Sequence, residues 1–122
     1  MIKNALSYLR RLNEEHRSAA DDARAECLDK LLDEFDDREK TANELYELTY
    51  SVLTDDDSPF ENAVISVLSC VVCKAYIAEG QSCLPEDLEA LQTDKIDGFF
   101  SYLSEYPSAE ECYRYFCREV CL

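Results

Sequence analysis

Apolar residues and one histidine recur at intervals of three and four positions along the first third of the chain. The series consists of Ile2, Leu6, Leu9, Leu12, His16, Ala20, Ala23, Cys27, Leu31 and Phe35, with Ala5 beside it. This spacing brings residues onto one face of an α-helix. It predicts either one long helix over 2–35 or two helices that meet near Ser18, where residues 18–21 have the character of a new helix start.

Three later segments carry signals for the first turn of a helix. Residues 41–44 and 108–111 both have the capping-box spacing, in which a hydroxyl and a carboxylate each accept a hydrogen bond from the other residue's backbone N–H. In the third segment Ser58 is a favourable cap, Pro59 suits the first helical position and Glu61 suits the first turn. Each segment is therefore expected to open a helix.

The residues that follow Pro59 are apolar nearly all round a helix. They include Val64, Ile65, Val67, Leu68, Val71, Val72 and Ile77, and the run stops at Gly80. A helix that is apolar on every side is buried, so a central helix is expected near 60–79. Shorter helices are expected at 84–91 and 93–103.

The length and composition of the chain fit one helical domain. With 122 residues, 47% of them apolar, the chain can build a hydrophobic core. Two glycines and three prolines are too few for the tight turns of a β-sandwich, and no segment alternates convincingly between apolar and polar residues. We therefore predict an all-α fold, a single-domain bundle of five to seven helices over residues 1–122.

The charge of the chain is strongly and unevenly negative. It has 27 acidic and 12 basic side chains, a net charge of −15. Residues 21–61 contain 15 of the acidic side chains and only four of the basic ones. Direct binding of nucleic acid is disfavoured, because contacts to phosphates need a basic surface.

Six acidic residues fall on one side of the helix expected over this segment. They are Asp22, Glu26, Asp29, Asp33, Asp36 and Asp37, called the acidic stripe below. Neighbours in the stripe would lie about 5–6 Å apart and destabilise the helix by a few tenths of a kcal/mol per pair. Within the same helix only Lys30 lies near enough to offset them. Such a surface suits a basic partner protein, and opposite potentials also speed the encounter.

The triplet Asp55, Asp56 and Asp57 stands between two expected helices. Acidic groups are favourable before a helix start, so helix punctuation explains the triplet, which could also add to the partner-binding surface. A calcium loop starting at Asp55 would need further oxygen ligands, a glycine in the turn and a closing Glu at the twelfth place, but Pro59, Phe60 and Ser66 stand at those places. We predict no metal site here.

No motif for a reaction is present, so neither catalytic residues nor a cofactor are predicted and an enzyme is not expected. Cys70 and Cys73 have a C-x-x-C spacing but lie in the middle of an apolar helix, where a thiolate is not stabilised. A zinc site with Cys117 and Cys121 is geometrically conceivable, although no glycine-containing turn flanks either pair. Packed core thiols are the preferred interpretation.

The compartment expected from these features is the cytoplasm. Seven cysteines cannot all pair within one chain, which favours reduced thiols. The longest nearly apolar run, 63–73, is much shorter than the ~20 residues of a membrane span, so no membrane association is predicted.

By composition the chain resembles small acidic inhibitors of nucleases or nucleic-acid-guided complexes, such as bacterial immunity proteins and phage anti-defence proteins. The first hypothesis is accordingly a non-enzymatic inhibitor whose acidic stripe occupies a basic surface of a partner, such as a nuclease or a nucleic-acid-binding complex. The alternative is a self-associating helical scaffold or assembly adaptor. In that case Ile2, Leu6, Leu9 and His16 would form a homodimer, and the acidic residues would serve solubility.

Overall fold

The computed structural model describes residues 2–17, 22–37, 39–51, 58–81 and 83–122. Seven α-helices occur in these residues: α1 (Ile2–Glu15), α2 (Asp22–Phe35), α3 (Ala42–Ser51), α4 (Pro59–Ala78), α5 (Glu86–Glu89), α6 (Ile96–Leu103) and α7 (Ala109–Tyr115). A 3₁₀ turn, Thr93–Lys95, precedes α6, and a π-helical turn, Phe116–Val120, continues α7. The described part contains no β-strand beyond a single bridge between Leu91 and Cys121. The all-α prediction is confirmed.

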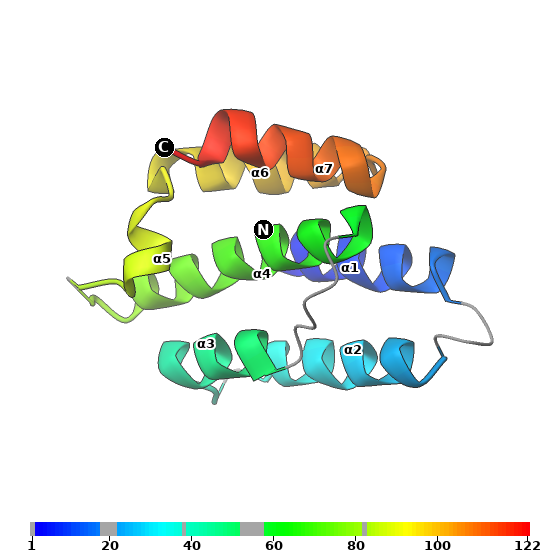
Figure 1. Cartoon of the computed structure of the whole chain (residues 1–122). Helices are drawn as coiled ribbons and strands as arrows, with labels where there is room; N and C mark the ends of the chain where they lie inside the picture. The colour runs from blue at the N-terminus through cyan, green and yellow to red at the C-terminus, as the bar shows by residue number, and fades with distance from the viewer. Residues whose placement is uncertain (1, 18–21, 38, 52–57, 82) are drawn as a thin grey trace.

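The helices form three layers (Figure 1). One outer layer holds α2 and α3, the middle layer holds α1 and α4, and the other outer layer holds α6 and α7. The short helix α5 lies at one end, where the chain passes from α4 towards α6. The middle layer is thus covered on both sides.

Helix α4 is the predicted central helix. Ser58 caps it by accepting a hydrogen bond from the Glu61 N–H at 3.2 Å, and Pro59 occupies the first helical position. Gly80, with a φ of 74°, stands just past its end, in a conformation that other residues rarely adopt. By length and composition alone this helix could cross a membrane, but 72% of its apolar window is buried inside the bundle. Such burial is typical of a core helix.

The apolar series over 2–35 belongs to two helices, because α1 ends at Glu15 and α2 begins at Asp22. Leu6, Leu9 and Leu12 of α1 are buried in the core, while Ile2 is partly exposed. His16 lies exposed just beyond α1, with its ring centroid 4.8 Å from that of Phe60. In the folded bundle, Ile2 and His16 are therefore accessible for the self-association of the alternative hypothesis, whereas Leu6 and Leu9 are not.

The buried side of α2 differs from the one predicted. Ala23 and Cys27, which the series placed on the apolar face, are exposed. The buried residues of the helix are Ala25, Leu28, Leu31, Leu32 and Phe35. Helix α1 packs against α2, where Asn13 reaches the Ala25 carbonyl and Asp29, so the covered side of α2 is set by its neighbours and not by the series over 2–35.

Candidate partner-binding surface

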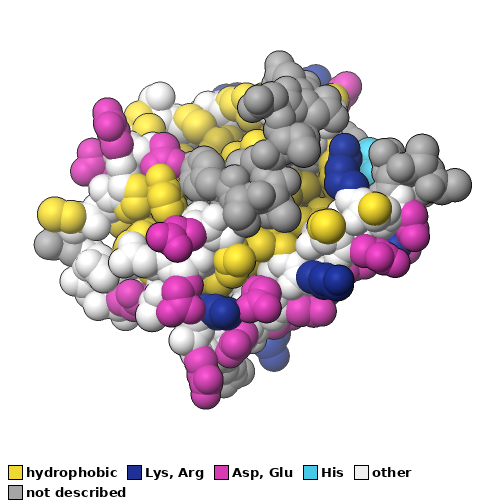
Figure 2. All heavy atoms as spheres, turned by 60° about the horizontal axis from the view of Figure 1, so that its bottom comes forward, with side chains coloured by type: hydrophobic (Ala, Val, Ile, Leu, Met, Phe, Trp, Pro, Cys, Tyr) yellow, Lys and Arg dark blue, Asp and Glu magenta, His cyan; other side chains and the backbone are white. Residues whose placement is uncertain are grey.

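The acidic stripe lies on the outer surface of α2 and on the two residues after it. Five of its six members are exposed, and Asp29 is half-buried. Figure 2, which looks onto the α2–α3 layer, shows acidic side chains gathered over this face beside an apolar strip. The predicted residues Asp55, Asp56 and Asp57 lie outside the described residues. What the structure adds is the set of side chains that hold the stripe in place.

Arg10 of α1 holds the C-terminal part of the stripe. Its Nη2 lies 3.0 Å from Asp33 Oδ1 and 2.8 Å from Asp36 Oδ2. These hydrogen bonds to Asp36 and Asp33 raise the pKa of Arg10 above its ordinary value, although partial burial opposes the shift. Asp33 nevertheless keeps 72% of its side-chain surface exposed. One oxygen of each carboxylate contacts Arg10.

Arg17 and Asn13 hold the N-terminal part. Arg17 contacts Asp22 Oδ1 at 2.7 Å and Asp29 Oδ2 at 2.6 Å, and it also pairs with Glu14. Asn13 is buried; its Nδ2 donates to Asp29 Oδ1 at 3.0 Å and to the Ala25 carbonyl at 2.9 Å. Both oxygens of Asp29 are therefore engaged within the chain. Asp29 joins α1 to α2 more than it offers charge to a partner.

Glu26 and Asp37 differ from the other members of the stripe. Neither forms an ion pair with any residue in the described ranges. The Asp37 carboxylate accepts a hydrogen bond from the Glu39 N–H at 3.0 Å. Glu34 and, more weakly, Asp37 raise the pKa of Lys40, so this lysine partly offsets the charge of Asp37. Glu26 and Asp37 take no part in the ion pairs of Arg10 and Arg17.

The sequence pattern within α2 did not reveal Arg10, Asn13 and Arg17. A signal was present, since the three residues are spaced by three and four positions and so share one face of α1. This signal could be used only if α1 was known to turn back along α2. The sequence did not decide between one helix and two over residues 2–35, so that arrangement was not predicted.

A second group of acidic residues lies at the α5 end of the bundle. It consists of Glu47 of α3, Glu79 at the end of α4, and Glu86, Asp87 and Glu89 of α5, called the α5-end cluster below. Asp87 accepts a hydrogen bond from the Tyr46 hydroxyl at 2.8 Å, and Glu79 accepts one from the Ala42 N–H at 2.6 Å. Burial, and then Glu79, Asp87 and Glu47 in that order, raise the pKa of Tyr76.

The cysteines do not form a metal site among the described residues. No group of three or more His, Cys, Asp or Glu side chains there is arranged to hold a metal ion. Cys70, Cys73 and Cys112 are buried, Cys27, Cys83 and Cys117 are exposed, and all seven thiols are free. Burial raises the pKa of the Cys112 thiol to about 12, so this thiol stays protonated and packs as a small apolar group.

The surface near His16 offers no arrangement for catalysis among the described residues. A hollow of about 400 Å³ there is lined by Glu15, His16, Pro59, Ser108 and Glu110, among others. The His16 Nδ1 lies 3.0 Å from the Leu12 carbonyl oxygen. The Oγ atoms of Ser58 and Ser108 accept hydrogen bonds from helix N–H groups as caps. The serines thus serve helix capping rather than nucleophilic chemistry.

A helical bundle with an exposed acidic surface suits the class of proteins that act by binding a basic partner. The family of the chain is consistent with that class. Residues 22–108 match the family model described as Immunity protein Imm6, and the chain belongs to this family. No curated protein and no solved structure matches the chain.

Membership of an immunity protein family implies that the partner is a toxin protein and suggests a non-catalytic inhibitor. The matched range runs from the first residue of α2 to the cap of α7, so it contains the whole acidic stripe and the α5-end cluster. Arg10 and Arg17, which hold the stripe, lie outside it.

Proposed function

We propose that the chain inhibits its toxin by laying the acidic stripe of α2 on a basic surface of that toxin, of the kind that nucleases and other nucleic-acid-binding proteins carry. Inhibition then follows from occupancy, because the toxin cannot bind its substrate while its basic surface is covered. No chemical step on the part of the chain is required.

The observation that carries this proposal is the ordered exposure of the stripe. Arg10 and Arg17 fix four of its carboxylates in place, and three of these, Asp22, Asp33 and Asp36, keep more than half of their side-chain surface exposed. A surface fixed before binding loses little conformational freedom when the complex forms. The two arginines also remove part of the charge, but the stripe has six carboxylates, and its net charge stays negative.

Glu26 and Asp37 stand outside the ion pairs of Arg10 and Arg17, and a basic partner is expected to gain most from contacts to these two carboxylates. Electrostatic complementarity of this kind speeds association and fixes orientation, and it is weakened by salt. The proposed compartment is the cytoplasm, a reducing environment that suits a chain whose seven thiols are all free.

The test is recovery of the toxin from an extract of the native host, with the tagged chain as bait and washes at low and then high salt. The proposal expects one toxin with a basic surface, released by the salt wash and inhibited by the purified chain at one equivalent. A toxin that resists salt and is still inhibited would leave the immunity role intact and overturn the basic-surface mechanism. An inhibited toxin with an acidic surface would likewise support the immunity role and overturn the basic-surface mechanism.

A growth assay provides an independent readout. Candidate toxins from genes next to that of the chain are expressed with and without it, because a cell that makes a toxin needs its inhibitor at the same time. Restored growth with wild-type chain, and no restoration with Glu26→Lys/Asp37→Lys, is the expected result. Full protection by the double variant would contradict the role of the stripe.

A further inference from the structure

Tyr106 adopts a backbone conformation that a tyrosine rarely takes. It stands just past the end of α6, where its N–H donates to the Leu103 carbonyl at 3.0 Å. Its φ of 52° lies in the left-handed region, and it is the one residue other than glycine with a positive φ in the described ranges. A helix end of this kind normally uses glycine or asparagine, because a residue with a large side chain is strained there. Glycine at position 106 would avoid this strain.

Full burial of the side chain does not explain why a tyrosine stands at this position. Tyr106 is 48% exposed, and its hydroxyl group forms no hydrogen bond within the described part of the chain. By contrast, the hydroxyl group of Tyr8 donates to the Pro107 carbonyl at 2.9 Å, and that of Tyr46 donates to Asp87 at 2.8 Å. Tyr106 thus presents an aromatic ring and a hydroxyl group at the surface.

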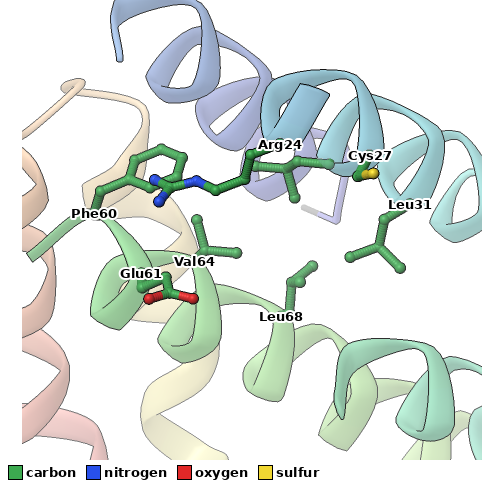
Figure 3. Close-up of a pocket in the computed structure, with 8 residues that line it drawn as sticks. Arg24, Cys27, Leu31, Phe60, Glu61, Val64 and Leu68 are labelled. Carbon is green, nitrogen blue, oxygen red and sulfur yellow. The ribbon is translucent and has the colours of Figure 1, made fainter. Parts of the chain in front are cut away.

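Arg11 of α1 holds the exposed ring in place. Its guanidinium carbon lies 4.1 Å from the centroid of the Tyr106 ring, and its Nε lies 3.3 Å from Glu15 Oε1. A second cation–π pair shows the contrast, since Arg24 lies over the Phe60 ring at 4.9 Å (Figure 3). Phe60 is buried, so that pair covers the core. At Tyr106 a cation instead fixes an aromatic side chain that the bundle leaves half exposed.

Tyr106 and the acidic stripe lie at the two edges of one face of the molecule. Helix α1 packs against both α2 and α6 and lies between them (Figure 1). Arg10 contacts Asp33 and Asp36 of the stripe, and the next residue, Arg11, contacts Tyr106. Successive helical residues point about 100° apart, so the outward strip of α1 separates the two contacts. A protein interface of standard size, about 800 Å² on each side, is wide enough to cover both.

We propose that Tyr106 is a second contact for the toxin, at which its hydroxyl group accepts a hydrogen bond from a lysine or arginine of the surface that covers the acidic stripe. This inference rests on the proposed function. The charge beside the ring favours a cation, because two exposed carboxylates, Glu15 and Glu105, accompany one arginine, Arg11. Tyrosine also suits an interface, since its large, rigid ring loses little conformational freedom on binding. The backbone strain then accompanies a ring that is kept at the surface for binding.

Two variants of Tyr106 separate binding from folding. Tyr106→Phe keeps the ring and its contact with Arg11, so the melting temperature should be unchanged, while the affinity for the toxin recovered from the host should fall about threefold. Tyr106→Gly removes the whole side chain and should weaken binding about tenfold or more. Its melting temperature should change little, because relief of the backbone strain offsets the lost contact. Scanning calorimetry of the free chain and titration calorimetry with the toxin measure the two quantities.

Tyr113 provides the control, because it is 38% exposed but belongs to α7, which packs on α4. Tyr113→Ala should leave the affinity unchanged, and an equal loss there would overturn the inference. Unchanged affinity in both Tyr106 variants overturns it too and leaves the immunity function in place. So does a large fall in the melting temperature of Tyr106→Gly, since the tyrosine would then serve packing. If the wild-type chain binds and inhibits no toxin, the proposed function fails and the Tyr106 contact fails with it.

Discussion

The two acidic regions of this protein carry similar charge in very different surroundings. In the acidic stripe, four carboxylates contact Arg10 or Arg17. In the α5-end cluster, Glu47, Glu86 and Glu89 form no ion pair with any residue of the described ranges. Within the described ranges, arginines partly neutralise the first region, whereas three carboxylates of the second region have no paired cation.

This difference separates two consequences of a high negative charge. Carboxylates held by arginines present their oxygens at fixed positions, which suits recognition of a particular surface. Carboxylates without fixed partners contribute a diffuse potential that favours solubility and attracts cationic partners from a distance. We therefore expect the stripe to determine specificity for the toxin, and the α5-end cluster to have a smaller, nonspecific influence on association.

The largest effect is expected from charge reversal in the two regions. Glu26→Lys/Asp37→Lys should weaken toxin binding about a hundredfold at low salt, because it places two cations against the basic surface of the toxin. Glu86→Lys/Glu89→Lys makes the same change in net charge and should weaken binding less than about threefold. The affinity of each double variant for the toxin is measured by calorimetry. Equal losses of affinity in the two variants would show that only the total charge matters.

The second largest effect is expected when the hydrogen bonds between α1 and the stripe are removed. Asn13→Ala removes two hydrogen bonds, to the Ala25 carbonyl and to Asp29, from a buried position. The free energy of unfolding is expected to fall by about 1–3 kcal/mol, since the Ala25 carbonyl loses a partner away from water. Urea denaturation followed by circular dichroism measures this loss. A variant as stable as wild type would mean that the hydrogen bonds are not formed in solution.

A smaller loss is expected when Arg10 is replaced. Arg10→Ala breaks the ion pairs with Asp33 and Asp36, both of which are well exposed, so the expected destabilisation is only about 0.5–1 kcal/mol. The effect should shrink at high salt. By contrast, Glu86→Lys should leave stability unchanged or raise it slightly, because it relieves repulsion among like charges. If Arg10→Ala stabilises the chain at low salt, the arginine does not hold the stripe.

The smallest effect concerns the titration of Tyr76. Because the pKa of Tyr76 is raised in the folded chain, its contribution to stability is complete below the unfolded value of about 10 and is lost as the pH rises through the raised pKa. Glu47→Gln should lower the pKa of Tyr76 slightly, since Glu47 contributes less to the raised pKa than burial, Glu79 or Asp87. Ultraviolet titration of the tyrosines detects the change, and Glu26→Gln is the control, expected to have no effect.

Local signals in the sequence were sufficient for most of the fold. Ser58 with Pro59, the capping box at Ser108 and the glycine at position 80 act through their own backbone neighbours, so they could be recognised without tertiary information. The central position of α4 followed from its apolar composition, because only burial accommodates such a helix.

The candidate site was less accessible to prediction. A single helix defines which residues share a face, and the stripe was found on that basis. The pattern within one helix does not show which neighbouring helix packs against each of its faces. The exposure of Cys27 and the pairing of Arg10 and Arg17 with the stripe depend on how α1 and α4 pack against α2.

The most direct test of the central claim is competition for the toxin between the chain and nucleic acid. Fluorescence anisotropy of a labelled oligonucleotide bound to the toxin is followed as the chain is added. If the stripe covers the basic surface, wild-type chain displaces the oligonucleotide with one equivalent, and Glu26→Lys/Asp37→Lys fails to do so. A stable complex in which toxin, chain and oligonucleotide are all bound would contradict the account.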